Sequence, residues 1–138
     1  KIIMFGMMRS PAESYAKVSV DAAVETADPH RLVLMLFDGA MTAISLARIQ
    51  MHNGQIPEKG AAISKAIDLI NNGLGASLDI EAGGELAERL AALYEYMAQR
   101  LLFANMKNSV AALDEVSELL GSLRDAWAQI SPGEQAAA

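Results

Sequence analysis

The stretch Thr26-Ala-Asp-Pro-His-Arg-Leu-Val-Leu-Met-Leu-Phe-Asp-Gly-Ala40 joins a helix start signal to the densest apolar run of the chain. Asp28 is a good N-cap, because its carboxylate can accept from the free N–H groups of the first turn. Pro29 suits the next position, where its missing N–H costs nothing. A helix is therefore predicted from Pro29 to about His52, where Asn53-Gly54 and then Pro57 end it.

This helix has two apolar faces at about 100° per residue. The first stripe contains Val33, Phe37, Ala40, Ile44, Ala47 and Met51. The second, on roughly the opposite side and interrupted by Thr42, contains Met35, Gly39, Leu46 and Ile49. An ordinary surface helix needs only one such face. The second face therefore requires cover, either from the protein's own chain or from a partner, and the two explanations can be combined.

The composition narrows the class of protein. A chain of 138 residues with 52% hydrophobic residues is long enough and apolar enough for one folded domain. Its net charge of −6 disfavours nucleic acid and anionic membrane surfaces. The absence of cysteine excludes disulfides and thiolate sites and is compatible with a cytoplasmic location. The sequence has no uninterrupted run of about 18 apolar residues, so no membrane span is expected.

Three further long helices are predicted after the break at Asn53. Apolar spacing indicates one helix over about 58–78, weakened by Gly73 and Gly75, where we expect bending or fraying. Another follows a break at 79–84, and the last begins after an Asn108 or Ser109 cap and stops at Ser131. The fold class is therefore all-α, an antiparallel four-helix bundle with crossings of about 20°.

The domain prediction has three parts. Residues 1–9 are expected to be a flexible N-terminus and 132–138 a disordered tail, with a single bundle domain over 10–131. Ser10-Pro11-Ala12-Glu13 predicts a short helix, and residues 10–25 are expected to cap the bundle because they are too short to fold alone.

No catalytic, cofactor or metal site emerges from the residues. His30, in a first helical turn, is expected to be solvated, and His52 suits the negative end of the helix dipole. Inward Glu-x-x-His pairs, which a di-metal bundle needs, are absent. The serines lack a histidine placed to serve as base. We therefore expect no enzyme, no cofactor and no metal.

The motifs and their order resemble the FliS family of flagellar export chaperones over about residues 15–130. The resemblance is carried by Tyr15, Val24-Glu25-Thr26-Ala27-Asp28-Pro29, Leu32-Val33-x-Met35-Leu36-Phe37-Asp38-Gly39-Ala40, Lys65-Ala66, Leu78-Asp79 with Gly83-Gly84, Leu93-Tyr94-x-Tyr96-Met97, Arg100-Leu101-x-x-Ala104-Asn105, Asp114-Glu115-Val116 and Arg124-Asp125-Ala126-Trp127. The sequence departs from the family pattern at Phe37, where tyrosine is frequent, and at Gly73 with Gly75.

The resemblance implies a cytosolic four-helix bundle that binds the disordered C-terminal segment of flagellin, prevents its premature polymerisation and delivers it to the flagellar type III export gate. The second apolar stripe would then contact this client, as an amphipathic helix in a groove. Candidate client-binding residues are Tyr15, Val18, Leu32, Met35, Gly39, Leu46, Ile49, Tyr96 and Phe103. Among these, Leu46, Ile49 and Phe103 were chosen by helical phase alone.

Three further interpretations stay open. The segment around Tyr15 and Val18 is expected to cover part of the client surface in the free protein and to leave when the client arrives. A generic adaptor that forms a homodimer when client-free is one alternative. A phosphotransfer or enzymatic bundle is another, and it would require a site that the residues do not supply. Other flagellar proteins are further candidate partners.

Overall fold

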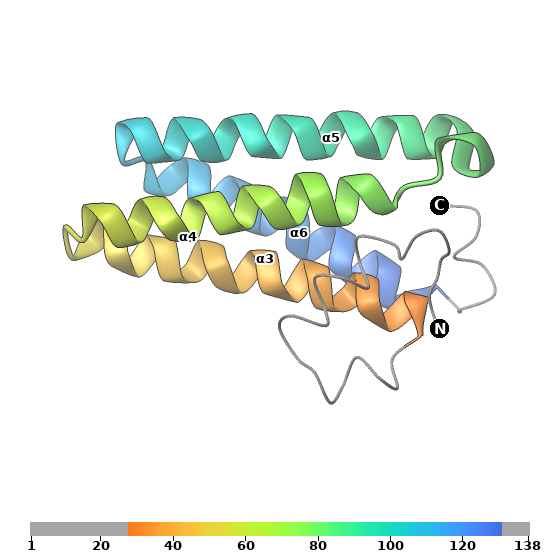
Figure 1. The fold of residues 1–138 in the computed structure, drawn as a ribbon, viewed down its shortest axis with the longest axis horizontal. Helices are drawn as coiled ribbons and strands as arrows, with labels where there is room; N and C mark the ends of the chain where they lie inside the picture. The colour runs from red at the N-terminus through yellow and green to blue at the C-terminus, as the bar shows by residue number, and fades with distance from the viewer. Residues whose placement is uncertain (1–27, 131–138) are drawn as a thin grey trace.

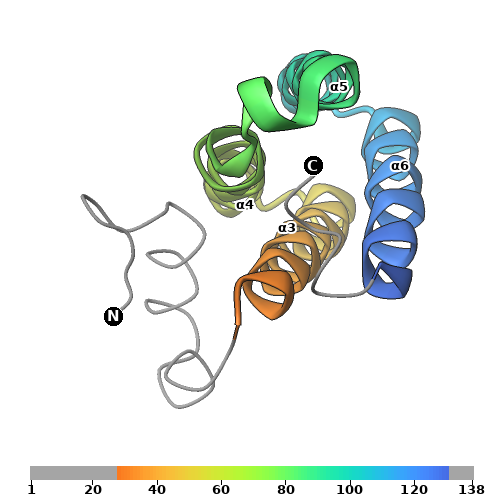
Figure 2. The ribbon, with the colours of Figure 1, turned by 90° about the vertical axis from the view of Figure 1, so that its right-hand side faces the viewer.

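The computed structural model describes residues 28–130, which form an antiparallel four-helix bundle (Figure 1). Seen end on, the helices stand at the corners of a square, with α3 and α5 at opposite corners (Figure 2). The predicted all-α bundle is confirmed. The predicted cap at 10–25, with Tyr15 and Val18, lies outside the described residues. The four helices are α3 (Pro29–His52), α4 (Ile56–Asp68), α5 (Ile80–Lys107) and α6 (Val110–Gln129).

Local capping signals set the helix ends where the sequence predicts them. Asp28 accepts a hydrogen bond from the Arg31 backbone N–H at 2.8 Å, and α3 ends at His52. Ser109, rather than Asn108, caps α6 through the Ala112 N–H at 3.1 Å. Asn108 instead ends α5 in the left-handed conformation, with φ of 51°.

The segment after α4, residues 69–77, has irregular helical geometry, as its glycines predict, but it is not frayed. After Asp68 the chain continues as a π-helical stretch, η1 (Leu69–Leu74), and a 3₁₀ turn, η2 (Gly75–Ser77). A Cβ added to Gly73 would lie 3.0 Å from Leu36 Cδ2, and one added to Gly39 would lie 3.3 Å from Leu69 Cδ1. Glycine therefore lets α3 and η1 pack closely, and this contact keeps the irregular stretch buried.

The break predicted over 79–84 is interrupted by a helical turn: the backbone is extended at Leu78 and Asp79 and non-helical again at Gly84. Residues from Ile80 already form a helical turn, and the chain bends at Gly84, which has φ of 56° and ψ of −133°. Asp79 caps this turn by accepting from the Ala82 N–H at 3.0 Å. The bend needs glycine because other residues rarely adopt a positive φ.

The buried surface of α3 is wider than the predicted first stripe. Phe37, Ala40, Ile44 and Ala47 are buried as predicted. Leu32, Leu36 and Ala43, which belong to neither predicted stripe, are buried as well. The reason is that α3 packs against both α4 and α6, so two neighbours share its surface.

By length and composition alone, α3 could also cross a membrane. In this bundle part of its apolar surface lies in the core, whereas Leu46 and Ile49 are exposed, and its polar edge pairs with α6. Arg48 donates to Asp114 and Arg124 donates to Asp38, each with a shortest N···O distance of 2.9 Å. These hydrogen bonds raise the pKa of both arginines above the ordinary value. The place of α3 between α4 and α6 accounts for its buried apolar residues but not for Leu46 and Ile49.

Candidate functional site

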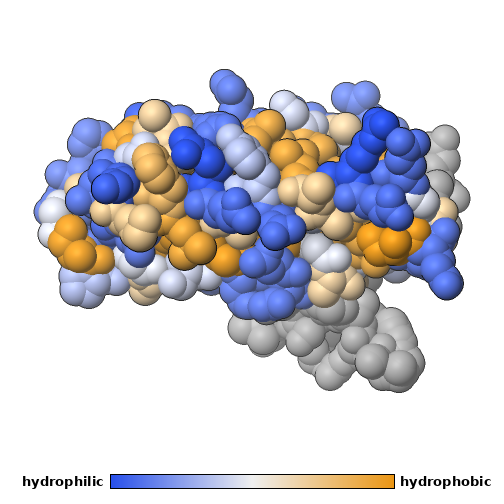
Figure 3. Space-filling model, turned by 90° about the horizontal axis from the view of Figure 1, so that it is seen from above, coloured by the Kyte–Doolittle hydropathy of each residue, from blue (hydrophilic) through white to orange (hydrophobic). Residues whose placement is uncertain are grey.

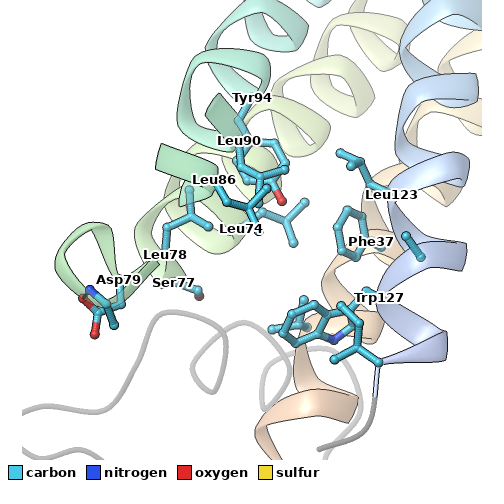
Figure 4. A pocket seen from close by; sticks show the side chains of 14 residues that line it. Phe37, Leu74, Ser77, Leu78, Asp79, Leu86, Leu90, Tyr94, Leu123 and Trp127 are labelled. Atoms are coloured by element: carbon cyan, nitrogen blue, oxygen red, sulfur yellow. Dashed lines mark hydrogen bonds between the residues drawn. The ribbon is translucent and has the colours of Figure 1, made fainter. Parts of the chain in front are cut away.

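An apolar groove opens at the end of the bundle where α3 begins and α6 ends. Its volume is about 510 Å³. Figure 4 shows its lining side chains, which come from α3, from η1, η2 and the connection to α5, from α5 itself, and from α6 and its C-cap. The lining residues are Val33, Phe37, Leu74, Ser77, Leu78, Asp79, Ala82, Leu86, Leu90, Tyr94, Leu123, Ala126, Trp127 and Ile130.

The Gly84 bend helps to form one rim of this groove. Asp79 and Ala82 line it from the turn before the bend, whereas Leu86 and Leu90 line it from the helix after the bend. In a straight helix, the turn that holds Ala82 would continue along the axis of α5 and would not line the groove. The groove therefore depends on a backbone conformation that glycine permits.

Trp127 forms part of the opposite wall and is held by His30. Its indole N–H donates to the His30 carbonyl oxygen at 2.9 Å, and the two rings stack with centroids 5.2 Å apart. The prediction of a solvated His30 is wrong. Its Nε2 atom lies 2.8 Å from the Trp127 carbonyl oxygen, so the first turn of α3 is tied to the last turn of α6.

Tyr94 reaches into the groove from α5 (Figure 4). Its side chain is buried, and this burial raises the pKa of the Tyr94 hydroxyl to about 12. The hydroxyl is therefore neutral at physiological pH. A Cβ added to Gly75 would lie at an ordinary contact distance of 4.0 Å from Tyr94 Cδ2, and its tighter neighbour would be the Ile70 carbonyl oxygen at 3.3 Å.

A second polar and aromatic cluster lies on the α5–α6 face. Arg100 donates to Glu115 at 2.8 Å, and its guanidinium carbon lies 4.7 Å from the centre of the Phe103 ring. The Tyr96 hydroxyl donates to the same carboxylate. Hydrogen bonds from Tyr96 and then from Arg100 lower the pKa of Glu115, and the bond to Glu115 raises the pKa of Tyr96. Both exposed rings thus have a partner within the bundle.

The predicted client-binding residues do not converge on one site. Leu32 is buried in the core and has no surface to offer a client in this conformation. Leu46 and Ile49 are exposed on α3, whereas Tyr96 and Phe103 are exposed on α5, at the opposite corner of the square (Figure 2). Met35 and Gly39 are half-buried.

None of the candidate residues within 28–130 lines the groove. Helical phase assigned Phe37 to the core, and Tyr94 and Trp127 were recorded only within family-like motifs and apolar stripes. The signal that the sequence does contain is the break predicted at 79–84. A break in a helix flanked by apolar residues leaves an end of the bundle that the neighbouring helices do not close.

Elsewhere the surface is mixed in character. On the face where α5 lies uppermost, hydrophobic side chains alternate with charged ones (Figure 3). Large exposed apolar residues on α5 are Ile80, Leu86, Leu102 and Met106. Within the described part of the chain, no three histidine or acidic side chains come together as a metal site.

Comparison with known proteins identifies the family. The family model described as "Flagellar protein FliS" matches residues 11–134. This chain belongs to the FliS family. A flagellar secretion chaperone FliS of Salmonella typhimurium is 51% identical over 123 residues, which cover 89% of this chain and 91% of the relative.

More distant relatives of this FliS-family protein carry the same description. The flagellar secretion chaperone FliSB of Pseudomonas aeruginosa is 48% identical, covering 86% of this chain and 94% of the relative. The FliS protein of Bacillus subtilis is 32% identical, covering 93% and 91%. The resemblance drawn from the sequence motifs is confirmed.

Proposed function

We propose that this FliS-family protein is a cytosolic export chaperone that binds the disordered C-terminal segment of flagellin, prevents its premature polymerisation and delivers it to the flagellar export apparatus. The observation that carries the proposal is the apolar groove of about 510 Å³ at the open end of the bundle. Such a groove suits one apolar face of an amphipathic helix. The relatives, which are named as flagellar secretion chaperones, support the same role.

The client contact extends beyond the groove in this proposal. Ordering a disordered client costs free energy, which broad apolar burial offsets. Leu46 and Ile49 offer exposed apolar surface on α3, the helix that also contributes Val33 and Phe37 to the groove. Val33 and Phe37 belong to the first stripe of α3, whereas Leu46 and Ile49 belong to the second, on roughly the opposite side. A client that covers both places would therefore pass around α3 as a wrapped segment.

In this proposal the chain before Asp28 covers part of the client-binding surface in the free protein and so controls access of the client. It joins α3 about one turn before Val33 and just over two turns before Phe37, two lining residues of the groove. Removing residues 1–18 is expected to change both client affinity and the solubility of the free protein. Unchanged values of both would contradict this control.

Calorimetric titration with a synthetic flagellin C-terminal peptide tests the proposal. We expect one-to-one binding, a negative heat-capacity change and a gain of helix by circular dichroism. The absence of heat and of new helix at micromolar peptide would contradict it. If light scattering then showed a concentration-dependent mass without peptide, the homodimeric adaptor would be favoured instead.

Two matched pairs of variants locate the contact. Leu86, 54% exposed in the groove, and Leu102, 55% exposed outside it, lie on the same helix. Leu86→Asp is expected to weaken peptide binding at least tenfold, whereas Leu102→Asp leaves it unchanged. Ile49→Asp on α3 and the similarly exposed Ile56→Asp on α4 test the wrapped surface in the same way. Equal effects within a pair would contradict the assignment of that surface.

A further inference from the structure

The groove holds one polar group that its apolar surroundings do not satisfy. Tyr94 is 5% exposed, and its side chain points into the groove beside Leu74, Leu86 and Leu90 (Figure 4). Its hydroxyl makes no hydrogen bond with residues 28–130. The hydroxyl oxygen keeps a small surface toward the groove, because the buried side-chain polar atom without a partner among the described residues is Gln50 Oε1 and not the Tyr94 oxygen. The hydroxyl is therefore available to a group that enters the groove.

The other polar side chains that line the described groove are already engaged. Ser77 Oγ donates to the Gly73 carbonyl oxygen at 2.6 Å, and Asp79 accepts from Ala82 N–H. The Trp127 indole donates to His30. Each of these groups serves the bundle itself. Tyr94 differs from them, since its hydroxyl faces the space that a ligand would fill.

We propose that Tyr94 is a specificity-determining residue, which donates its hydroxyl hydrogen to a neutral side-chain oxygen of the client. The inference rests on the proposed function, because the occupant is the flagellin segment. The client would present a serine, threonine, asparagine or glutamine within one turn of a large apolar side chain. The apolar residue packs against the walls, and the polar residue meets Tyr94.

Charge and protonation favour a neutral acceptor over the alternatives. Burial keeps the Tyr94 hydroxyl protonated, so it can act as a donor. A client carboxylate would enter beside Asp79 in a protein of net charge −6, which disfavours it. Backbone carbonyls within a client helix are already paired in the helix. A neutral side-chain oxygen meets neither objection.

Tyr94→Phe separates this role from a structural one. The variant removes a hydroxyl that bonds to none of residues 28–130, so its melting temperature is expected to stay the same or rise. Its affinity for the flagellin peptide is expected to fall by about three- to tenfold, as the loss of one hydrogen bond requires. Ser122→Ala, which removes an exposed hydroxyl of α6 outside the groove, is the matched control and changes neither quantity.

An alanine scan of the peptide then identifies the partner of Tyr94. At one serine, threonine, asparagine or glutamine, substitution weakens binding to the wild type but not to Tyr94→Phe, a non-additive pair. Equal affinity of wild type and Tyr94→Phe overturns this inference and leaves the proposed function standing. A peptide that binds neither protein overturns both. A lower melting temperature for Tyr94→Phe would assign the hydroxyl to folding and also overturn the inference.

Discussion

Trp127 and His30 hold each other by two hydrogen bonds and a ring stack. The Trp127 indole N–H donates to the His30 carbonyl oxygen at 2.9 Å, and His30 Nε2 donates to the Trp127 carbonyl oxygen at 2.8 Å. The second bond requires a proton on Nε2, because a carbonyl oxygen only accepts. The rings lie 18° from parallel. This pair closes one edge of the groove by joining helix ends that are 97 residues apart.

His30→Ala is expected to destabilise the protein by about 1–2 kcal/mol, because it removes a hydrogen bond and the stacked ring. Trp127 is the only tryptophan, so intrinsic fluorescence reports on this pair directly. Its emission should shift to longer wavelength as the indole gains water. His52→Ala, an exposed position at the other end of α3, is the control. An unchanged emission spectrum of His30→Ala would contradict the role of His30 in holding the indole.

Glu115 is expected to make stability depend on pH in the acid range. Its folded pKa is lowered by hydrogen bonds from Tyr96 and Arg100, whereas the unfolded value is ordinary, about 4.3. The unfolded chain therefore binds more protons between the two values, and stability falls as pH drops through this window. Thermal unfolding of wild type and Glu115→Gln should differ most above about pH 5 and converge below about pH 4.

The control for this titration is Glu118→Gln, at an exposed position on the same helix. It should keep the acid dependence of the wild type. If the difference between wild type and Glu115→Gln stayed constant from neutral to acid pH, the hydrogen-bonded cluster would not contribute through the charge of Glu115.

Lys59 is expected to stabilise the end of α5. It is 3% exposed, and its ammonium donates to the Asn105 carbonyl oxygen at 3.0 Å and to Asn108 Oδ1. A cation there also meets the negative end of the α5 dipole. Lys59→Met should lower the free energy of unfolding by about 1–3 kcal/mol, measured by urea denaturation. Lys65→Met, exposed on the same helix, should have little effect, and an equal loss in both variants would refute the interaction.

Two glycines should respond to alanine in opposite directions. Gly60 lies within α4 with open space around its Cα, so Gly60→Ala should stabilise the bundle by about 0.5–1 kcal/mol. Gly84 also has open space but a φ of 56°, so Gly84→Ala should destabilise it by about 1–2 kcal/mol through backbone strain. Calorimetric melting temperatures measure both. A stabilising Gly84→Ala would show that the bend does not need glycine.

Local sequence signals were sufficient for most of the fold. Helix start and stop signals act within one helical turn, so they can be recognised in the sequence without knowing which helix packs nearby. Examples are the start at Asp28-Pro29, the stop at Asn53-Gly54 and the cap at Ser109. Gly73 and Gly75, which follow α4, likewise predict irregular helical geometry. Fraying was wrong because Leu36 and Leu69 pack across the α3–η1 contact and keep that stretch buried, which a single helix cannot reveal.

The groove and its lining residues could not be predicted from local sequence signals in the same way. Helical phase gives directions around one axis and does not say how wide a sector two neighbours will cover. The family motif points to Leu32 as a client contact, although the structure buries Leu32 in the core. Helical phase places Leu46 and Ile49 outside the first stripe, and both are exposed. The groove brings together residues as far apart in the chain as Val33 and Ile130, and no spacing along the sequence predicts that they lie close in space.

The sequence by itself determined the family, the helical class, both ends of α3 and the start of α6, because motifs and caps are short-range properties. The tertiary structure alone decided which apolar residues the neighbouring helices cover and which they leave at the open end. It also decided the partners of His30 and the isolation of the Tyr94 hydroxyl. Those outcomes follow from the packing of four helices against one another, in which residues far apart in the chain compete for the same space.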